Sequence, residues 1–169
     1  MPRRSAGILL YRIAGGGLEV LLVHPGGPFF ARRDIGSWGV PKGEYEAGEE
    51  PLACAIREFE EELGQAPPDG PMTPLGEIRQ KNGKLVTAWG LEGDLDPGAI
   101  KSNTFTLEWP PRSGRTQEFP EVDRAAWLSV EGAGEKISDA QRPLLDRLVE
   151  ALDRVRLPTP PAGSGSRLI

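Results

Sequence analysis

The alternation of apolar and polar residues predicts several short strands along the chain. Apolar runs of strand length lie at residues 5–12, 18–24, 38–40, 75–80, 84–91, 104–109 and 125–130. A glycine-rich segment joins the first two runs, and the fourth and fifth flank Asn82-Gly83, a dipeptide that favours tight hairpin turns. The pattern therefore predicts two strand hairpins and three further single strands.

Two segments carry apolar residues at helical spacing instead. The first, residues 50–63, has Pro51 in its opening turn and Gly64 directly after its end, which is typical of helix boundaries. The second covers residues 139–154, where the apolar positions are Leu144, Leu145, Leu148, Val149 and Leu152. The order hairpin, helix, strands, helix predicts an α/β fold, in which helices cover both faces of a mixed sheet.

The chain of 169 residues has the length of one domain rather than two. We expect this domain to span residues 1–156. From Leu157 onward the composition shifts to Pro, Gly and Ser, which predicts a disordered tail over residues 157–169. Residues 25–37 are also rich in Gly and Pro and predict a loop.

The overall charge narrows the classes of function. The net charge is −5, which argues against a general nucleic-acid binder. An acidic protein that binds polyanions needs metal ions to neutralise them. No apolar run approaches the roughly 20 residues that cross a bilayer, so we expect a cytoplasmic protein without a membrane partner. Cys54 is the only cysteine, which excludes an intrachain disulfide and favours a small packed residue.

Acidic residues are concentrated around the first predicted helix. Eight of the 25 lie close together, namely Glu44, Glu46, Glu49, Glu50, Glu58, Glu60, Glu61 and Glu62. At about 100° per residue, Glu58, Glu61 and Glu62 fall within roughly 100° of one helix face. An apolar stripe on roughly the opposite side contains Leu52, Ile56, Phe59 and Leu63. We therefore expect the helix to dock through this stripe and to present three carboxylates on its other side.

Like charges three and four residues apart repel each other and destabilise a helix. Such a triplet needs a compensating cation, which is either a basic partner or a bound metal ion. Mg²⁺ prefers hard oxygen ligands and takes a few carboxylates together with water and substrate phosphates. The spacing of the three acids alone leaves two interpretations open, a metal site and a plain solvated surface.

The residues around the triplet form a more specific pattern. Gly43 is followed after five residues by Glu49, and after seven more by Arg57-Glu58-Phe59 and Glu60-Glu61-Glu62-Leu63-Gly64. This pattern resembles the Nudix box, and it matches all eight fixed positions of that box over 22 residues. It departs only at the following position, where Gln65 replaces the usual aliphatic residue. That change concerns the packing of the loop after the helix and leaves the acids unaffected.

The resemblance extends over about residues 5–150. Trp38-Gly39-Val40-Pro41-Lys42-Gly43 is similar to the usual lead-in to the box, and Glu121-Val122-Asp123 followed by Trp127-Leu128 is similar to a late strand beside the active site of this family. The resemblance implies a Nudix-type α/β/α sandwich with a mixed β-sheet between helices. Pro41-Lys42-Gly43 is also similar to the asymmetrical diadenosine polyphosphate hydrolases of the family.

The resemblance also implies a site for divalent ions, which are Mg²⁺ or its substitute Mn²⁺. The implied ligands are the carboxylates of Glu58, Glu61 and Glu62 and the main-chain carbonyl of Lys42. Gly43 is interpreted as a backbone requirement, because a side chain there would crowd the loop that carries this carbonyl. A later acid adds a ligand or a base, for which Glu121 is the first choice and Glu118 the alternative. Glu58 is the first candidate for the general base that takes a proton from the attacking water.

Basic and aromatic residues complete the expected site. Arg57 of the box is expected to pair with Glu49 and pin the loop to the helix, with a contact to a substrate phosphate as the alternative. The ammonium group of Lys42 contacts a phosphate or lies in solvent. Further candidates for polyphosphate binding, or for plain solvated loops, are Arg32, Arg33, Lys81 and Lys84. The aromatic side chains that stack on a nucleobase or join the core are Phe29, Phe30 and Trp38, and His24 is expected to be structural.

The implied reaction is attack of water on phosphorus in a nucleoside diphosphate that is linked to a further group. We expect a dinucleoside polyphosphate such as diadenosine tetraphosphate, because a long polyphosphate needs the additional positive contacts that the basic loop residues supply. Nucleoside triphosphates and nucleotide sugars are alternative substrates. A binding module without catalysis is the alternative from another class, but such a module does not need a self-repelling triplet. The oligomeric state stays open.

Overall fold

The computed structural model of the protein describes residues 3–156. Its strands and α-helices are β1 (Arg4–Ala14), β2 (Gly17–Pro25), β3 (Lys42–Glu44), α1 (Pro51–Leu63), β4 (Thr73–Arg79), β5 (Leu85–Glu92), β6 (Thr104–Glu108), β7 (Thr116–Pro120), β8 (Val122–Ser129), α2 (Val130–Lys136) and α3 (Arg142–Arg156). Short 3-10 helices lie at Pro97–Ala99 and Asp139–Gln141. The tail expected over residues 157–169 lies outside the described residues. No helix within residues 3–156 has the length and apolar character needed to span a membrane.

The central sheet has six strands. Five follow the order β4-β5-β1-β2-β8, and β3 pairs with β1. Strands β1 and β5 run parallel, whereas the other pairs are antiparallel, so the sheet is mixed as the sequence predicts. The β1–β2 and β4–β5 pairs are the two predicted hairpins. At the second hairpin, the side chain of Asn82 accepts a hydrogen bond from the main-chain N–H of Lys84, and Gly83 has a φ of 88°.

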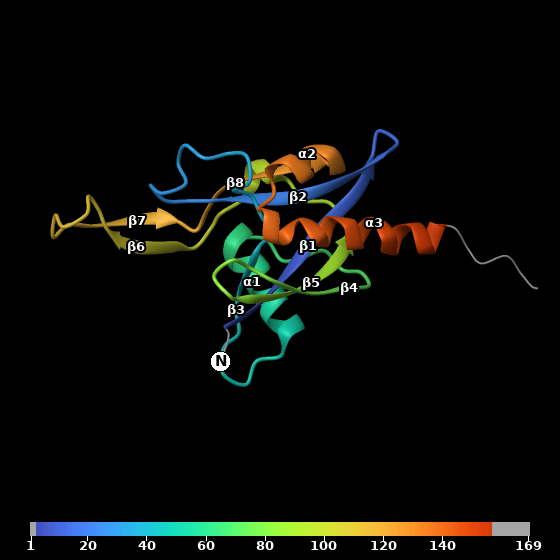
Figure 1. The fold of residues 1–169 in the computed structure, drawn as a ribbon, viewed down its shortest axis with the longest axis horizontal. Helices are drawn as coiled ribbons and strands as arrows, with labels where there is room; N and C mark the ends of the chain where they lie inside the picture. The colour runs from blue at the N-terminus through green and yellow to red at the C-terminus, as the bar shows by residue number, and fades with distance from the viewer. Residues whose placement is uncertain (1–2, 157–169) are drawn as a thin grey trace, which may run out of the picture.

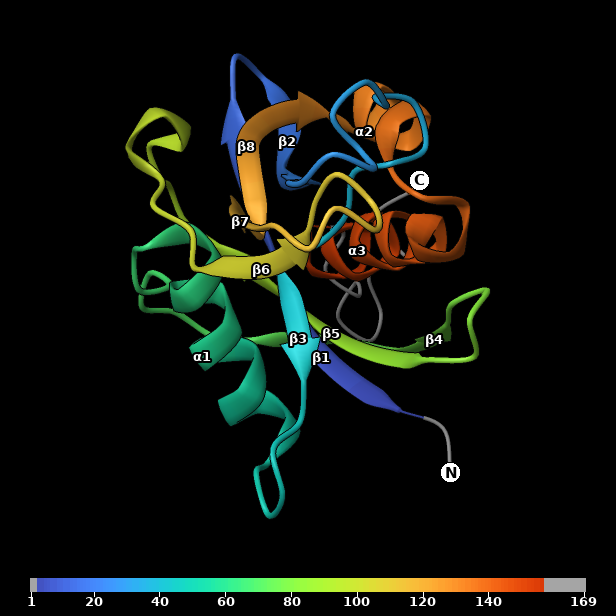
Figure 2. The same ribbon diagram turned by 90° about the vertical axis from the view of Figure 1, so that its left-hand side faces the viewer.

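Helices cover both faces of this sheet, as Figure 2 shows with α1 on one side and α2 and α3 on the other. The core under α1 includes the buried side chains of Ile8, Leu10, Leu21, Phe59, Leu63 and Leu91. The core on the opposite face includes those of Leu9, Leu22, Val86, Leu144, Leu145 and Leu148. Neighbouring residues of β1 alternate between the two cores because successive side chains of a strand point to opposite faces. The expected α/β/α sandwich is confirmed.

Several predicted boundaries differ from the structure. The strand expected at residues 38–40 is reduced to two isolated bridges, Val23 with Gly39 and Trp38 with Ile137. Extended strand pairing stops there because Pro41 has no N–H group and the N–H group of Val40 donates to the side chain of Gln141. Helix α2, which contains two glycines, and strand β7, which is mostly exposed, were not predicted.

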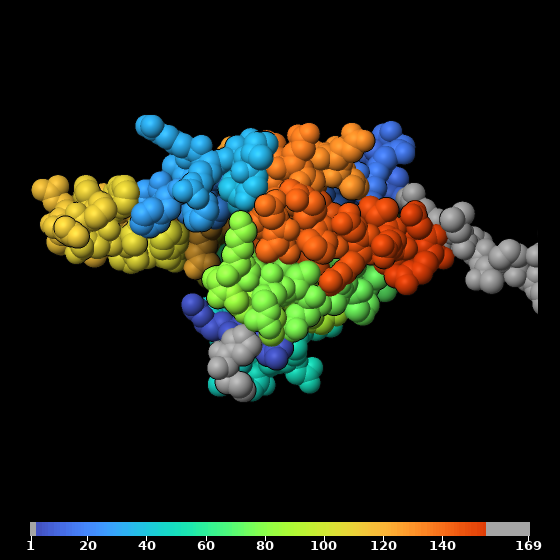
Figure 3. Space-filling view, viewed as in Figure 1, coloured from blue at the N-terminus to red at the C-terminus, as the bar shows by residue number. Residues whose placement is uncertain are grey.

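Strands β6 and β7 form a separate two-stranded sheet that projects from the body as an arm (Figure 1). The strand expected at residues 104–109 therefore exists, but it does not join the central sheet. In the space-filling view the arm lies beside the 25–37 loop (Figure 3). The rings of Phe29 from this loop and Trp109 from the arm meet edge to face, with their centroids 5.6 Å apart. The contact attaches the turn end of the arm, where Trp109 follows β6, to the loop.

The face through which α1 docks differs from the predicted one. Its buried residues are Cys54, Ala55, Phe59, Glu62 and Leu63. Ile56 of the expected stripe is 38% exposed, whereas the small side chains of Cys54 and Ala55 are fully buried against the sheet. The helix is thus rotated towards its acids, and Glu62, only 9% exposed, lies on the docking side. The expectation that all three carboxylates point away from the sheet is wrong for Glu62.

This rotation predicts opposite outcomes for two apolar residues of α1. Phe59→Ala removes a fully buried ring and should lower the free energy of unfolding by about 3–5 kcal/mol. Ile56→Ala removes a partly exposed side chain and should cost much less, although both residues belong to the stripe predicted from sequence. Urea unfolding of the two variants measures the difference. Equal losses would contradict the observed docking face.

Candidate active site

The expected acids of α1 line one polar recess of about 410 Å³. Glu58, Glu61 and Glu62 come from α1, Lys42 from β3, and Glu121 from the turn between β7 and β8. Glu118, the alternative to Glu121, is instead exposed on β7 and accepts a hydrogen bond from the hydroxyl of Thr104. The structure thus brings the predicted ligand residues together and favours Glu121 over Glu118.

Arg57 is the basic partner that compensates the acids of α1. Its Nε and Nη2 donate to the two carboxylate oxygens of Glu49, at 2.8 and 2.9 Å. Its Nη1 donates to Glu58 at 2.9 Å and to Glu61 at 3.2 Å. The predicted ion pair between Arg57 and Glu49 is therefore confirmed. The hydrogen bonds that Arg57 donates to Glu49 lower the pKa of Glu49 to about 2 and raise the pKa of Arg57.

The remaining charge in the recess is poorly compensated. Burial raises the pKa of Glu62, and burial followed by repulsion from Glu61 raises the pKa values of Glu58 and Glu121. The main-chain N–H of Lys42 donates to Glu62 at 3.3 Å. The pKa of the Lys42 ammonium group is lowered by burial and by the nearby Lys84. Carboxylates whose charge is disfavoured in this way are stabilised by an added cation.

The carboxylate oxygens of the recess are chemically suited to a divalent metal ion. Hard carboxylate oxygens are the ligands that Mg²⁺ and Mn²⁺ prefer. Within residues 3–156, however, no three acidic, histidine or cysteine side chains converge tightly enough to enclose an ion. Glu58 and Glu61 are instead turned towards Arg57 Nη1. Metal binding at these acids therefore requires at least one of these carboxylates to change its position.

Gly43 is required for a different reason than the sequence suggested. A Cβ at this position would overlap the carboxyl group of Glu58. The absence of a side chain at Gly43 therefore makes room for a candidate ligand. Cys54, the predicted packed cysteine, is fully buried nearby, its thiol contacts the main-chain oxygen of Gly43, and burial raises its pKa to about 11.

The predicted basic residues are distributed over different places. Lys84 lies in the carboxylate recess, with its Nζ 3.9 Å from Glu44. Lys81 lines another recess of about 380 Å³, formed with the turn after β4 and the segment before α3. Arg32 is exposed in the 25–37 loop. The guanidinium of Arg33 lies over the ring of Phe30, 5.7 Å from its centroid.

His24 is a structural residue, as predicted. It is fully buried, and its ring nitrogens contact Asp123 Oδ1 at 2.7 Å and the main-chain oxygen of Arg33 at 2.6 Å. Trp38 also belongs to the core, where it is 4% exposed and donates its indole N–H to Asp34. The histidine and the tryptophan thus hold the 25–37 loop against the sheet.

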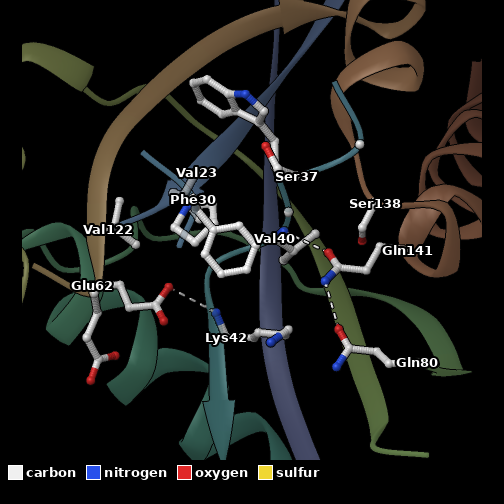
Figure 4. A pocket seen from close by; sticks show the side chains of 15 residues that line it. Val23, Phe30, Ser37, Val40, Lys42, Glu62, Gln80, Val122, Ser138 and Gln141 are labelled. Atoms are coloured by element: carbon white, nitrogen blue, oxygen red, sulfur yellow. Dashed lines mark hydrogen bonds between the residues drawn. The ribbon is translucent and has the colours of Figure 1, made fainter. Parts of the chain in front are cut away.

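Sequence reasoning missed a cavity of about 300 Å³ beside the carboxylates. It shares Lys42, Glu62 and Glu121 with the carboxylate recess, and Phe30, Gln80 and Gln141 line its other parts (Figure 4). A more open recess of about 570 Å³ shares no lining residue with this cavity and includes Arg57, Glu61, Lys101 and Asn103. No sequence motif marks Gln80 and Gln141, which lie 61 positions apart and meet only in the folded chain.

Comparison with known protein families gives one match that covers both the fold and the box. The model of the NUDIX domain matches residues 1–148. The chain belongs to the Nudix family. The hydrolases of this family act on phosphoanhydride bonds and generally use divalent metal ions. The enzyme interpretation therefore holds over that of a binding module without catalysis.

Two proteins of other organisms are similar in sequence to this Nudix chain. An RNA pyrophosphohydrolase of Rhodospirillum rubrum is 39% identical over 168 residues, which cover 94% of this chain and 97% of the relative. An octanoyltransferase of Myxococcus xanthus is 30% identical over 138 residues, or 80% of this chain. The chain spans only 33% of that second relative. The similarity to the first, which extends over nearly its whole length, supports a pyrophosphohydrolase activity.

Solved structures share the fold. The Nudix domain of Shewanella oneidensis NrtR, complexed with ADP ribose, superposes with a TM-score of 0.63 at 16% identity and covers 90% of this chain and 89% of that one. A C. elegans Ap4A hydrolase in a binary complex gives a TM-score of 0.62 at 22% identity, covering 89% and 98%. At these identities the likeness concerns the fold.

The packing of Gly43 against Glu58 predicts a loss of turnover without a loss of fold. In Gly43→Ala the carboxyl of Glu58 has to move by about 1 Å or more, which should lower kcat about 100-fold. The matched control is Gly17→Ala, where an added Cβ meets nothing within 4 Å. Steady-state kinetics and melting temperatures of both variants test this. Parental turnover in Gly43→Ala would show that Glu58 need not keep its position.

The pair between Arg57 and Glu49 predicts a specific effect of acid. The folded pKa of Glu49, about 2, lies below the ordinary value of 4.5, so its ionised form stabilises the fold above pH 4.5. This contribution is lost as the pH falls from 4.5 towards 2. Glu49→Gln should therefore flatten the fall in melting temperature over that range, whereas the neighbouring exposed Glu50→Gln should not. Parallel acid profiles for the parent and Glu49→Gln would refute the role of the pair.

Proposed function

We propose that this Nudix hydrolase cleaves a dinucleoside polyphosphate, such as diadenosine tetraphosphate, in a reaction that depends on Mg²⁺. The observation that carries the proposal is the presence of two separate recesses that adjoin the carboxylates at different residues. The 300 Å³ cavity meets them at Lys42 and Glu62, and the open recess meets them at Arg57 and Glu61. A substrate with a nucleoside at each end of a phosphate chain uses both recesses, with the chain over the acids.

The residues that would hold Mg²⁺ are Glu58, Glu61, Glu62, Glu121 and the main-chain carbonyl of Lys42. When bound there, the ion lowers the pKa of a coordinated water and neutralises charge that develops on the phosphates. Glu58 is suited to take the proton of the attacking water, because burial and repulsion from Glu61 raise its pKa above the ordinary value. Arg57 holds the loop to the helix through Glu49, and the ammonium groups of Lys42 and Lys84 face the same recess, where phosphates would lie.

A second candidate substrate is the triphosphorylated 5′ end of an RNA. The similarity to the R. rubrum RNA pyrophosphohydrolase over nearly its whole length supports it. In that case the cavity would take the first nucleoside, and the open recess would be free for other contacts. The net charge of −5 makes long-range attraction of RNA unfavourable, so we rank this substrate, together with nucleoside triphosphates, behind dinucleoside polyphosphates.

A direct comparison of substrates tests the ranking. Values of kcat/KM are measured at equal Mg²⁺ for substrates that carry the same base, namely diadenosine tetraphosphate, ATP and an RNA oligonucleotide with a 5′-triphosphorylated adenosine. We expect the highest value for the dinucleoside polyphosphate, and hydrolysis in ¹⁸O-labelled water identifies the attacked phosphorus. A higher value for any triphosphate or for the RNA would overturn the ranking and leave the family assignment intact.

The carboxylates themselves are tested by Glu62→Gln. Loss of this charge should lower kcat by about 100-fold or more, as expected when stabilisation of the transition state around the metal is lost. In metal-free buffer near neutral pH the variant should melt at or above the temperature of the parent, because burial disfavours the charge of Glu62. Glu150→Gln, an exposed change of the same charge on α3, is the control for both measurements. Parental turnover in Glu62→Gln would exclude a catalytic role for the triplet.

A further inference from the structure

We propose that Gln80 selects the nucleobase that enters the 300 Å³ cavity, by offering it only an N–H donor, and that Gln141 fixes this polarity from behind. The inference rests on the proposed function to the extent that the substrate carries a nucleoside. It adds the chemical class of the base, which is one with a carbonyl oxygen on the edge that faces Gln80. Gln80 is thus a specificity residue, and Gln141 is a positioning residue.

The polarity follows from a chain of two hydrogen bonds that begins at the backbone. The main-chain N–H of Val40 donates to Gln141 Oε1 at 2.9 Å. Since a backbone N–H can only donate, the oxygen of the Gln141 amide has to face it. The Nε2 of Gln141 then donates to Gln80 Oε1 at 3.1 Å, which uses the oxygen of the second amide. The side-chain Nε2 of Gln80 takes no part in these two hydrogen bonds.

Burial makes this orientation costly to reverse. Gln141 is 4% exposed, so a flipped amide would set its NH₂ group against the N–H of Val40 with little water to separate the two donors. Gly39 adds a steric requirement, because a Cβ there would lie 2.8 Å from Gln141 Oε1. The local backbone therefore leaves the space that this amide occupies.

The free amide nitrogen of Gln80 borders the cavity. Within residues 3–156 its Nε2 has no hydrogen-bond partner, although the side chain is only half-buried and water can reach it. In Figure 4 Gln80 and Gln141 lie on one side of the cavity and Glu62 on the other, with the ring of Phe30 between them. A substrate whose phosphates lie at the acids therefore places its base against Phe30, with one edge towards Gln80.

The chemistry of this edge separates two kinds of base. A donor on the protein matches the carbonyl oxygen of a 6-oxopurine or a 4-oxopyrimidine. It opposes the exocyclic amino group of a 6-aminopurine or a 4-aminopyrimidine, which is also a donor. Because a matched donor and acceptor gain a hydrogen bond that two opposed donors cannot form, we expect oxo bases to be favoured about tenfold. The kcat/KM of a guanosine substrate should thus exceed that of the corresponding adenosine substrate.

Two variants reverse the polarity by different routes. In Gln80→Glu, one carboxylate oxygen keeps the bond from Gln141 Nε2 and the other faces the base as an acceptor. In Gln141→Glu, one oxygen keeps the bond from Val40 N–H and the other attracts Gln80 Nε2, so the oxygen of Gln80 turns into the cavity. Both changes should shift the guanosine-to-adenosine ratio about tenfold or more towards adenosine. A merely structural role of Gln141 would lower both activities equally and leave the ratio unchanged.

The experiment compares guanosine and adenosine forms within each substrate class. Ratios of kcat/KM are measured for diguanosine over diadenosine tetraphosphate and for GTP over ATP, with the parent, both variants and Gln117→Glu, a control on the exposed arm. Binding of GDP and ADP to the Mg²⁺-loaded protein gives the same ratio without turnover. A low activity on dinucleoside polyphosphates would therefore defeat the proposed function but not the base preference.

Three results would overturn the inference. The first is a parent ratio near one in both classes and in binding. The second is a guanosine-to-adenosine ratio that is the same in Gln80→Glu as in the parent. This result would refute the inference even if the buried Gln141→Glu variant does not fold. The third is an equal shift in the Gln117→Glu control. Agreement of Gln80→Glu and folded Gln141→Glu in direction would support the proposal, because both changes present an oxygen of residue 80 to the base.

Discussion

The side on which α1 rests against the sheet is the constraint on which the site depends. Phe59 and Leu63 are fully buried beneath it, and the small Cys54 and Ala55 allow a close approach. This rotation brings Glu62 into the docking side and leaves Glu58 and Glu61 at its border. Hydrophobic packing thus holds together carboxylates that repel each other, at a cost in stability that an ion or a basic group has to offset.

Arg57 provides part of that compensation in the protein. One edge of its guanidinium binds Glu49 in a bidentate manner, while Nη1 reaches Glu58 and Glu61. This separation of the contacts of Arg57 has a functional consequence. The bonds from Nε and Nη2 to Glu49 can persist while Glu58 or Glu61 exchanges Nη1 for an ion. The loop before α1 is thus attached through bonds that do not involve Glu58 or Glu61. A guanidinium that made only the second set of contacts would lose its anchor at the same step.

The sequence predicted the parts of the fold that local patterns determine. The two hairpins, the helix of the box and the α/β/α layers follow from periodicity, turn residues and box spacing. The docking face of α1 was not predicted correctly, because Ile56 was included in the apolar stripe while Cys54 and Ala55 were left out of it. Strand β7 was missed because its exposed residues need no apolar pattern, and helix α2 because its glycines are poor helix formers.

The same distinction holds for the site. The acids of the box were proposed because a motif with fixed spacing carries them, and Glu121 because the segment around it is similar to a late strand of the family. The cavity beside them was not found, because Gln80 and Gln141 come from distant segments and their bond exists only after folding. Arg32 and Lys81 were candidates by charge alone, and the structure places them outside the carboxylate recess. Charge in a loop does not determine where that loop lies.

The central claim is that the acids gathered by α1 form the metal site, and the most direct test is a Mn²⁺ titration followed by electron paramagnetic resonance. The signal of free Mn²⁺ is recorded for the parent, for single Gln variants at Glu58, Glu61 and Glu62, and for Glu150→Gln. The account predicts that each of the three variants weakens Mn²⁺ binding about tenfold or more, while Glu150→Gln binds as the parent does. Parental affinity in all three variants would contradict it.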